Sequence, residues 1–376
     1  MAAYVAQILM PLLMPRDNKS EIKSRNTQEE KTLTSTDASS TTELPTTTQQ
    51  WVLASRPTGL PTDENFRLET VDLPELNDGD ILVANSVATV DPYMRGRMND
   101  TKSYVPPFQL DQPMTGGAVG TVLASKSDKF QVGDAVRHSY GWQTNAVIAD
   151  SEATPVDLNV APAAAYLGIL GLTGLTAYVG LTAVGEMKEG DVVFISGAAG
   201  AVGSAAGQFA KQMGASRVIG SAGSDEKVER LLELGFDAAF NYNDGPVAEQ
   251  LAQAAPEGID FYFDNVGGDH LEAAIGAMRT FGRVAMCGAI SQYNNTGAPT
   301  GPRNLALAIG KCITLRGFVL GKYLHLAGEF QERMAPLVVS GKVAYDVTTR
   351  HGIENMPAAF LELFSGGNTG KMVVEF

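Results

Sequence analysis

The feature that most constrains the fold is a glycine-rich turn between a short apolar run and a longer apolar segment. The run covers residues 192–195, the turn contains Gly197, Gly200 and Gly203, and the apolar segment continues to residue 213. Glycines permit a tight turn and let a ligand approach the backbone, and the first N–H groups of a helix are free to bind an anion. The pattern is typical of the strand–turn–helix unit that binds the pyrophosphate of a dinucleotide.

The middle of the chain repeats this alternation of strand and helix. Short apolar runs of the buried-strand type follow one another, and helical segments at 225–234 and 269–278 lie between some of them. The predicted strands cover residues 192–195, 217–221, 238–242, 259–264, 283–287 and 313–319. Alternation of this kind predicts a parallel sheet with helices on both faces, which is a doubly wound Rossmann domain.

The segments on either side of this region have a different pattern. From residue 51, short alternating runs are separated by turn signals such as Asn77-Asp-Gly-Asp80, which predicts a compact β-rich domain. From about residue 343 the chain returns to strand and loop character. We therefore expect an α/β protein of two domains. The expected division is an extension at 1–48, the first part of the β-rich domain at 49–170, the Rossmann domain at 171–342 and a return to the β-rich domain at 343–376.

The extension and one long uncharged stretch require separate interpretation. Twelve of the 22 residues from 27 to 48 are Ser or Thr. Such a segment cannot bury enough apolar surface to offset its ordering entropy, so residues 1–48 are expected to be disordered. The stretch from 158 to 185 carries no charged side chain and has the hydropathy of a membrane span. Its glycines and threonines instead predict helices packed closely inside a domain.

Charge and cysteine content exclude several classes of function. The chain has 28 basic and 42 acidic residues, a net charge of −14. We expect no binding to nucleic acid or to a membrane, because both need clustered Lys and Arg. Two cysteines, Cys287 and Cys312, are too few for a disulfide framework or a four-thiolate zinc site, and the four histidines are scattered. We expect two free thiols, no metal site and a cytoplasmic location.

The end of the second predicted strand bears on the choice of dinucleotide. Enzymes that use NAD usually place a carboxylate there for the ribose hydroxyls. Here the corresponding residues are Ser221 and Ala222, and the acids Asp225 and Glu226 follow in the first turn of the next helix. Lys227 could reach a 2′-phosphate, but from these residues alone an ordinary solvated helix lysine is the better interpretation. The choice between NAD and NADP therefore stays open at this point.

Several motifs then occur in a highly specific order. They are Val90-Asp-Pro-Tyr-Met-Arg95, Gly171-Leu-Thr-Gly-Leu-Thr-Ala-Tyr178, Ala199-Gly-Ala-Val-Gly-Ser204, Gly223-Ser-Asp-Glu-Lys227, Phe240-Asn-Tyr242, Tyr262-Phe-Asp-Asn-Val-Gly-Gly268, Cys287-Gly-Ala-Ile-Ser-Gln-Tyr-Asn294 and Asn355-Met-Pro-Ala-Ala-Phe360. From about residue 50 to its end, the chain resembles the zinc-independent medium-chain dehydrogenase/reductases. Within them it is most similar to the leukotriene/prostaglandin reductases, bacterial curcumin reductases and plant alkenal double-bond reductases.

The resemblance implies a GroES-like catalytic domain built from both ends of the chain, a Rossmann domain between them, and NADP as the cofactor. The implied cofactor contacts are Gly200, Ala201, Val202, Gly203 and Ser204 at the pyrophosphate; Lys227 and Tyr242 at the 2′-phosphate; and Asn265, Cys287, Gly288, Ala289, Ile290, Ser291, Gln292, Tyr293, Phe318, Val319, Leu320 and Asn368 on the nicotinamide side. One position departs from the family. Some mammalian members carry a tyrosine where this chain has Gly321, and the nearest tyrosine here is Tyr323.

The activity implied by the resemblance is reduction of the C=C bond of α,β-unsaturated aldehydes and ketones, with hydride delivered to the β-carbon. Tyr293 and Tyr93 are the candidate donors to the enolate oxygen, together with a ribose hydroxyl of the cofactor, because a phenol donates without carrying charge. Each tyrosine could instead only line the pocket. Two alternatives stay open, a quinone reductase of the same superfamily and a nucleotide-bound protein without catalysis. A homodimer is expected by analogy, since the strand at 313–319 would otherwise be an unprotected edge.

Overall fold

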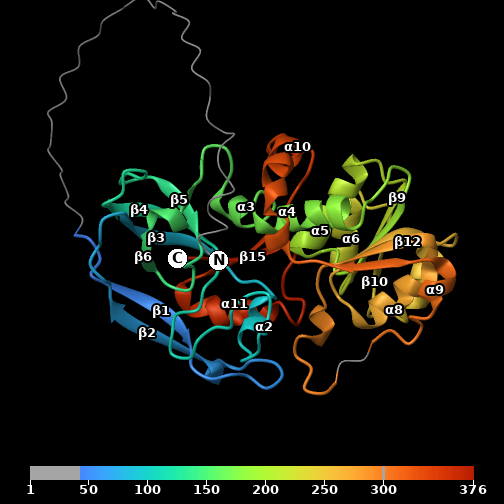
Figure 1. Ribbon diagram of the computed structural model, residues 1–376, viewed down its shortest axis with the longest axis horizontal. Coiled ribbons are helices and arrows are strands. Elements are labelled where there is room, and N and C mark those ends of the chain that lie inside the picture. Colours follow the sequence, from blue (N-terminus) through green and yellow to red (C-terminus); the bar gives the residue numbers. More distant parts are fainter. Residues whose placement is uncertain (1–42, 299–300) are drawn as a thin grey trace, which may run out of the picture.

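The computed structural model describes residues 43–298 and 301–376, which form two domains side by side (Figure 1). One domain is β-rich and the other is an α/β layer structure, so the predicted fold class is confirmed. Residues 1–42, most of the predicted extension, lie outside the described residues. The first strand begins at Thr47, so the last two residues of the segment expected to be disordered belong to a sheet.

The α/β domain is built on a six-stranded parallel sheet in the order β10-β9-β8-β11-β12-β13. Its strands are β8 (Val192–Ile195), β9 (Arg217–Ala222), β10 (Ala238–Asn241), β11 (Ile259–Asp264), β12 (Met278–Met286) and β13 (Thr314–Gly317). The order reverses between β8 and β11, and ligands of such sheets bind outside the carboxyl ends of the strands at that point. The sheet therefore places the site at the turns that follow β8 and β11.

Helices cover both faces of this sheet, as the alternation predicts. They are α4 (Leu172–Val179), α5 (Ala201–Gln212), α6 (Asp225–Glu233), α7 (Val247–Ala254), α8 (Gly268–Ala277), α9 (Leu307–Lys311) and α10 (Ala327–Val339). Alternate residues of β8 serve the two faces: Val193 and Ile195 pack with α4, α5 and α10, whereas Phe194 packs with α7 and α8. Both faces are thus buried, as a parallel sheet requires.

One strand begins earlier than its sequence pattern indicates. The apolar pattern predicts a strand at 283–287 after a helix ending at 278, but β12 already starts at Met278 and the helix ends at Ala277. Met278 pairs with Ile259, and a register shift follows where Phe281 takes a positive φ of 64°. The irregularity interrupts the alternation of buried residues, which hides the first half of the strand from pattern analysis.

The β-rich domain is formed by both ends of the chain. Its strands are β1 (Thr47–Leu53), β2 (Phe66–Asp72), β3 (Asp80–Thr89), β4 (Ala118–Ser125), β5 (Ala135–His138), β6 (Asn145–Ala149), β7 (Thr154–Pro155), β14 (Val347–His351) and β15 (Lys371–Glu375). The long strand β3 pairs with β4, β6 and β15, so the carboxyl-terminal strands complete a seven-stranded sheet. Helices α2 (Met94–Arg97) and α11 (Met356–Glu362) pack on the same core, where Phe66 stacks on Trp142 at 6.2 Å.

The uncharged stretch at 158–185 joins the two domains. It forms α3 (Ala163–Leu167), α4 and a π-helical turn (Gly180–Val184), with α3 against β3 and β4 and α4 against α5. A Cβ atom on Gly174 would lie 1.8 Å from the carbonyl oxygen of Ile169, so the close packing needs glycine there. Among the described residues, no helix is both long and apolar enough to cross a membrane.

Candidate active site

The turn after β8 has the geometry of a dinucleotide-binding turn. Gly197 takes a positive φ of 56°, a conformation that L side chains rarely adopt. A Cβ atom on Gly203 would lie 2.5 Å from the carbonyl oxygen of Gly197, so only glycine lets α5 pack this closely on the turn. The N-cap residue of α5 is Gly200, which has no side chain to bond the first N–H groups. These groups are therefore open to an anion.

The carboxyl-terminal segment closes over this turn. The amide of Gly370 donates to the carbonyl oxygen of Ala199 at 2.7 Å, and the Nδ2 atom of Asn368 donates to the carbonyl oxygen of Gly370 at 2.8 Å. Two predicted parts of the site, the pyrophosphate turn and Asn368, are thus brought together although they are far apart in sequence.

The end of β9 carries no carboxylate. Its last residues Ser221 and Ala222 are 0% and 2% exposed, and the carbonyl oxygen of Ser221 accepts the amide of Ala198 from the phosphate turn. The first carboxylates follow in α6, whose N-cap Ser224 accepts the backbone N–H of Lys227. The second strand therefore presents a neutral end, as the sequence indicates.

Lys227 and Tyr242 both adjoin the 223–227 turn. The Nζ atom of Lys227 donates to the carbonyl oxygen of Gly366 at 2.8 Å, and burial lowers the pKa of this lysine. The Tyr242 hydroxyl lies 2.6 Å from the position that a Cβ atom would take on Gly223. Its ring meets His270 edge-on at 5.3 Å. An ammonium and a phenol thus lie beside the turn that follows the neutral end of β9.

The turn after β11 supports the segment predicted for the nicotinamide side. The carbonyl oxygen of Asp264 accepts the amides of Cys287 and Gly288 at 2.8 and 3.0 Å. The Nδ2 atom of Asn265 donates to the carbonyl oxygen of Ser196 at 2.8 Å, which links β11 to the phosphate turn. The 287–293 segment, Asn265 and the turn therefore share one hydrogen-bonded frame.

A buried carboxylate that is not among the predicted site residues lies at the centre of this frame. Asp264 is 1% exposed, and its Oδ1 atom accepts the Tyr262 hydroxyl and the amide of Gly267, both at 2.8 Å. Burial raises the pKa of Asp264, and the hydrogen bonds from Gly267 and Tyr262 oppose this rise. The Asp264 carboxylate therefore holds the turn that follows β11 by accepting its backbone N–H groups. Asp264 belongs to the Tyr262-Phe-Asp-Asn265 motif, but only Asn265 of this motif is a predicted site residue.

The segment that follows β13, whose residues 318–320 are also predicted for the nicotinamide side, contains aromatic and apolar residues. The ring of Phe318 lies edge-on to Tyr323 with their centroids 6.2 Å apart, and Leu320 packs on the same core. A Cβ atom on Gly321, the position at which some relatives carry tyrosine, would meet nothing within 4 Å. Tyr323, two residues after Gly321, therefore supplies the tyrosine ring that contacts Phe318.

Tyr293 ends the 287–293 segment, which follows β12. Its hydroxyl oxygen accepts the amide of Ala289 at 3.3 Å, which leaves the hydroxyl proton available for donation. Burial is the largest cause that raises the pKa of Tyr293, and Tyr104 and Cys287 add to the rise. The phenol is therefore neutral at pH 7.

Tyr93 lies in the β-rich domain, at the N-terminus of α2. Burial and the charge of Asp91 raise its pKa, and Arg97 opposes this effect. Asp91 itself forms a buried ion pair with Lys371 of β15, which holds the turn carrying Tyr93 to the sheet. Both predicted tyrosines are thus neutral phenols at pH 7.

A third tyrosine, Tyr104, was not predicted. It is 57% exposed, yet its hydroxyl couples electrostatically to Cys287 and Arg97, and burial of the hydroxyl end raises its pKa. It also couples to both Tyr93 and Tyr293, so it joins the tyrosines of the two domains.

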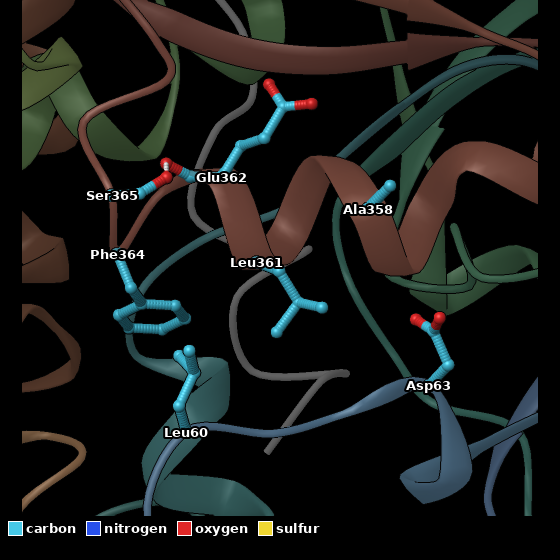
Figure 2. Close-up of a pocket in the computed structure, with 7 residues that line it drawn as sticks. All are labelled: Leu60, Asp63, Ala358, Leu361, Glu362, Phe364 and Ser365. Atoms are coloured by element: carbon cyan, nitrogen blue, oxygen red, sulfur yellow. Dashed lines mark hydrogen bonds between the residues drawn. The ribbon is translucent and has the colours of Figure 1, made fainter.

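The β-rich domain has a surface pocket of about 390 Å³ between the loop that contains Leu60 and helix α11 (Figure 2). Leu60 and Phe364 face each other in it, Leu361 points towards it from α11, and Glu362 turns to the other side of the helix. None of the predicted site residues lines it. The pocket is therefore separate from the frame around the phosphate turn.

Comparison with known proteins identifies the family. Two family models match, described as the N-terminal domain of oxidoreductase at residues 49–156 and zinc-binding dehydrogenase at residues 201–340. The NADPH-dependent curcumin reductase of Escherichia coli (strain K12) is 40% identical over 332 residues, 87% of this chain and 96% of that protein. The 2-alkenal reductase (NADP(+)-dependent) of Nicotiana tabacum is 41% identical over 334 residues, 87% and 96% of the two chains.

A solved structure agrees with these relatives. The crystal structure of CurA in complex with NADPH from Vibrio vulnificus superimposes with a TM-score of 0.82 at 42% identity, covering 87% of this chain and 98% of that chain. The chain belongs to the medium-chain dehydrogenase/reductase family. The predicted family and the prediction of an oxidoreductase are both confirmed.

Members of this family divide into those with and those without zinc, and one family model carries zinc in its description. Across the described ranges, 43–298 and 301–376, no group of three or more His, Cys, Asp or Glu side chains is arranged to hold a metal ion. That this medium-chain reductase works without zinc stays a prediction. Turnover that survives prolonged chelation would support it, and loss of turnover restored by zinc would contradict it.

Proposed function

We propose that this protein reduces the carbon–carbon double bond of α,β-unsaturated aldehydes and ketones with NADPH. The observation that carries the proposal is that Tyr104 of the β-rich domain interacts electrostatically both with Tyr93 and with Tyr293, which lies in the segment that follows β12. The relatives named for reduction of curcumin and of 2-alkenals support the same substrate class, since both are conjugated carbonyl compounds.

The residues around the phosphate turn fit a dinucleotide. The open N–H groups at the start of α5, the close packing at Gly203 and the neutral end of β9 are what such a ligand needs. We assign the pyrophosphate to Gly200–Ser204 and the 2′-phosphate to Lys227 and Tyr242. The 287–293 segment, Asn265, the 318–320 residues and Asn368 would enclose the nicotinamide. When bound, NADPH supplies the hydride that the reaction requires.

The tyrosines carry the protein's part of the chemistry. Negative charge develops on the carbonyl oxygen of the substrate as its β-carbon is reduced, and a donor fixed beside that oxygen lowers the barrier. Tyr293 keeps its proton free, because its oxygen accepts the Ala289 amide, and it is our principal candidate for this donor. Tyr93 would donate from the opposite domain, while solvent protonates the α-carbon.

The thiol of Cys287 is protected from the substrate. Conjugated carbonyl compounds alkylate thiolates, and this cysteine lies in the predicted lining of the site. Burial raises the pKa of Cys287 to about 12, so it stays protonated at neutral pH. A protonated thiol is a poor nucleophile, which lets the enzyme handle electrophilic substrates without inactivating itself.

A substrate panel tests the proposal. NADPH oxidation is followed with an enal, an enone, a curcumin-like diketone and a quinone, each also with NADH. We expect turnover of the conjugated carbonyls with NADPH and comparatively little with the quinone. Quinone turnover above that of every enone would favour the quinone reductase alternative. No oxidation with any substrate would favour a nucleotide-bound protein without catalysis.

We further propose that two copies associate through the outer strand β13. This strand is the edge of the parallel sheet, and large apolar side chains are exposed around it. They are Phe281 (73%), Met286 (37%), Leu305 (50%), Leu307 (44%) and Ile309 (83%). Pairing of two β13 strands would cover these side chains and remove the open edge.

A further inference from the structure

Arg95 is an almost completely buried cation that the proposed mechanism does not use. It lies in α2, two residues after Tyr93, and is 3% exposed. Burial lowers the pKa of Arg95, and no carboxylate of the described residues offsets this effect. A buried charge without an opposite charge is costly, so its hydrogen bonds need a function that outweighs the cost.

The hydrogen bonds of Arg95 connect three segments. Its Nη2 and Nε atoms donate to the carbonyl oxygen of Gly59 at 2.7 and 3.1 Å. Its Nη1 atom donates to the Oδ1 atom of Asn99 at 2.8 Å, within the same domain. Its Nε atom also donates to the Oδ1 atom of Asn294 at 3.0 Å, and Asn294 belongs to the other domain, directly after Tyr293. The guanidinium therefore bridges the supports of both candidate tyrosines.

Gly59 shows independently that the two domains meet here. It takes a positive φ of 77°, and a Cβ atom on it would lie 3.3 Å from the Cγ2 atom of Thr296. The loop that contains Gly59 thus packs directly on the segment that follows Tyr293. One side chain, Arg95, holds that loop and Asn294 at the same time.

We propose that Arg95 is a positioning residue that clasps the two domains through Asn294, so that Tyr93 and Tyr293 face the same substrate carbonyl. The inference rests on the proposed function for its catalytic consequence, but the clasp itself rests on the Arg95 contacts. The amide oxygen of Asn294 is the essential acceptor. A carboxylate oxygen at this place would serve as well, because Arg95 has no other anionic partner among the described residues.

Three variants test the clasp. Asn294→Leu removes the acceptor, Asn294→Asp keeps it, and Asn99→Leu removes an Arg95 bond that lies within one domain. We expect kcat to fall about fivefold to tenfold in Asn294→Leu, because loss of one hydrogen bond lets the tyrosines drift apart. Asn294→Asp and Asn99→Leu should stay within about twofold of the wild type. The Kd for NADPH should be alike in all four proteins, since the cofactor turn is untouched. The Tm should fall in both Leu variants, because each removes a hydrogen-bond acceptor from the buried guanidinium, so a lower Tm does not distinguish them whereas kcat does.

The same proteins distinguish failure of the clasp from failure of the proposed function. An unchanged kcat in Asn294→Leu, or equal losses in Asn294→Leu and Asn99→Leu, would overturn the clasp. If the wild type turns over no conjugated carbonyl compound, the proposed function fails. The clasp is then tested separately, by amide hydrogen exchange in the loop that contains Gly59. Faster exchange in the 57–60 loop of Asn294→Leu than of Asn294→Asp supports it, and equal exchange overturns it.

Discussion

At the scale of single residues, the choice of cofactor depends on very few groups. The neutral end of β9 has no carboxylate to repel a 2′-phosphate, and Lys227 and Tyr242 stand beside it. In the described structure Lys227 bonds the carbonyl oxygen of Gly366, which uses one of its three N–H donors. The remaining donors are available to an anion.

Lys227→Ala should weaken NADPH selectively. A hydrogen bond to a charged group contributes roughly 1.5–3 kcal/mol, so the Kd for NADPH should rise about tenfold to a hundredfold. The Kd for NADH should hardly change, because NADH lacks the phosphate. Lys211→Ala removes a lysine of the same domain that pairs with Asp237, and it should change neither Kd. Equal losses for both cofactors in Lys227→Ala would show that this lysine supports the fold instead.

Tyr293→Phe should lower kcat about a hundredfold with little change in KM, since one oxyanion donor commonly contributes that much. Because burial raises the pKa of Tyr293, its hydroxyl stays protonated above the ordinary tyrosine pKa of about 10. The wild-type kcat should therefore stay constant with rising pH at least up to that value. Steady-state kinetics from pH 6 to 10 measure both effects. An unchanged kcat in the variant would make Tyr293 a pocket wall only.

The sequence predicts the local parts of the site and misses those that depend on the meeting of the domains. The glycines of the phosphate turn and the neutral end of β9 follow from motif and position within one strand–turn–helix unit. Arg95 belongs to one of the quoted motifs, but its role and that of Tyr104 do not follow from the local sequence, because Asn294 and Cys287 lie far along the chain in the other domain. Asp264 was missed since its role comes from burial, which a motif does not show.

At the scale of secondary-structure elements, the strand–turn–helix unit depends on the approach of α5 to the turn. The predicted end of this helix at residue 213 is one residue beyond its observed end at Gln212. Strand and helix bounds elsewhere follow the apolar pattern closely except in two strands. In β12 the irregularity at Phe281 breaks the pattern, and β13 (Thr314–Gly317) is shorter than the predicted strand at 313–319. Elements with regular periodicity are thus predictable, and those with a register shift are not.

Gly203→Ala should disturb this unit. The new Cβ atom would lie 2.5 Å from the carbonyl oxygen of Gly197, so α5 must move away from the turn. Overpacking of this kind costs about 1–3 kcal/mol of unfolding free energy, and the Kd for NADPH should rise with it. Gly328→Ala in α10, where a Cβ atom meets nothing within 4 Å, should cost nothing. Urea unfolding and cofactor titration provide the measurements, and equal stability of the two variants would contradict the account.

At the scale of the whole molecule, the amino-terminal boundary can be tested by two truncations. Thr48 is 4% exposed and its Oγ1 atom accepts the amide of Asn145 at 3.0 Å, so it belongs to the folded body. Removal of residues 1–42 should leave Tm and turnover unchanged, because the composition of that segment cannot support a core. Removal of residues 1–48 takes away the start of β1 and should lower Tm. A lower Tm already in the shorter truncation would show that residues 1–42 stabilise the protein.

The proposed dimer predicts a second whole-molecule result. Light scattering should give twice the mass of one chain for the wild type. The Ile309→Asp variant should have the mass of one chain, because a charge cannot be buried against the apolar side chains of a second copy. Val132→Asp, at an apolar side chain of the β-rich domain that is 68% exposed, should leave the dimer intact. A wild-type mass of one chain across a wide concentration range would refute the proposal.

The position of a transferred label tests the central claim most directly. The protein is given an enone together with NADPH that carries deuterium at the transferable position of C4, and the product is examined by NMR. Reduction of the double bond predicts a saturated ketone with one deuterium on the carbon β to the carbonyl. An allylic alcohol with deuterium on the former carbonyl carbon would contradict the account.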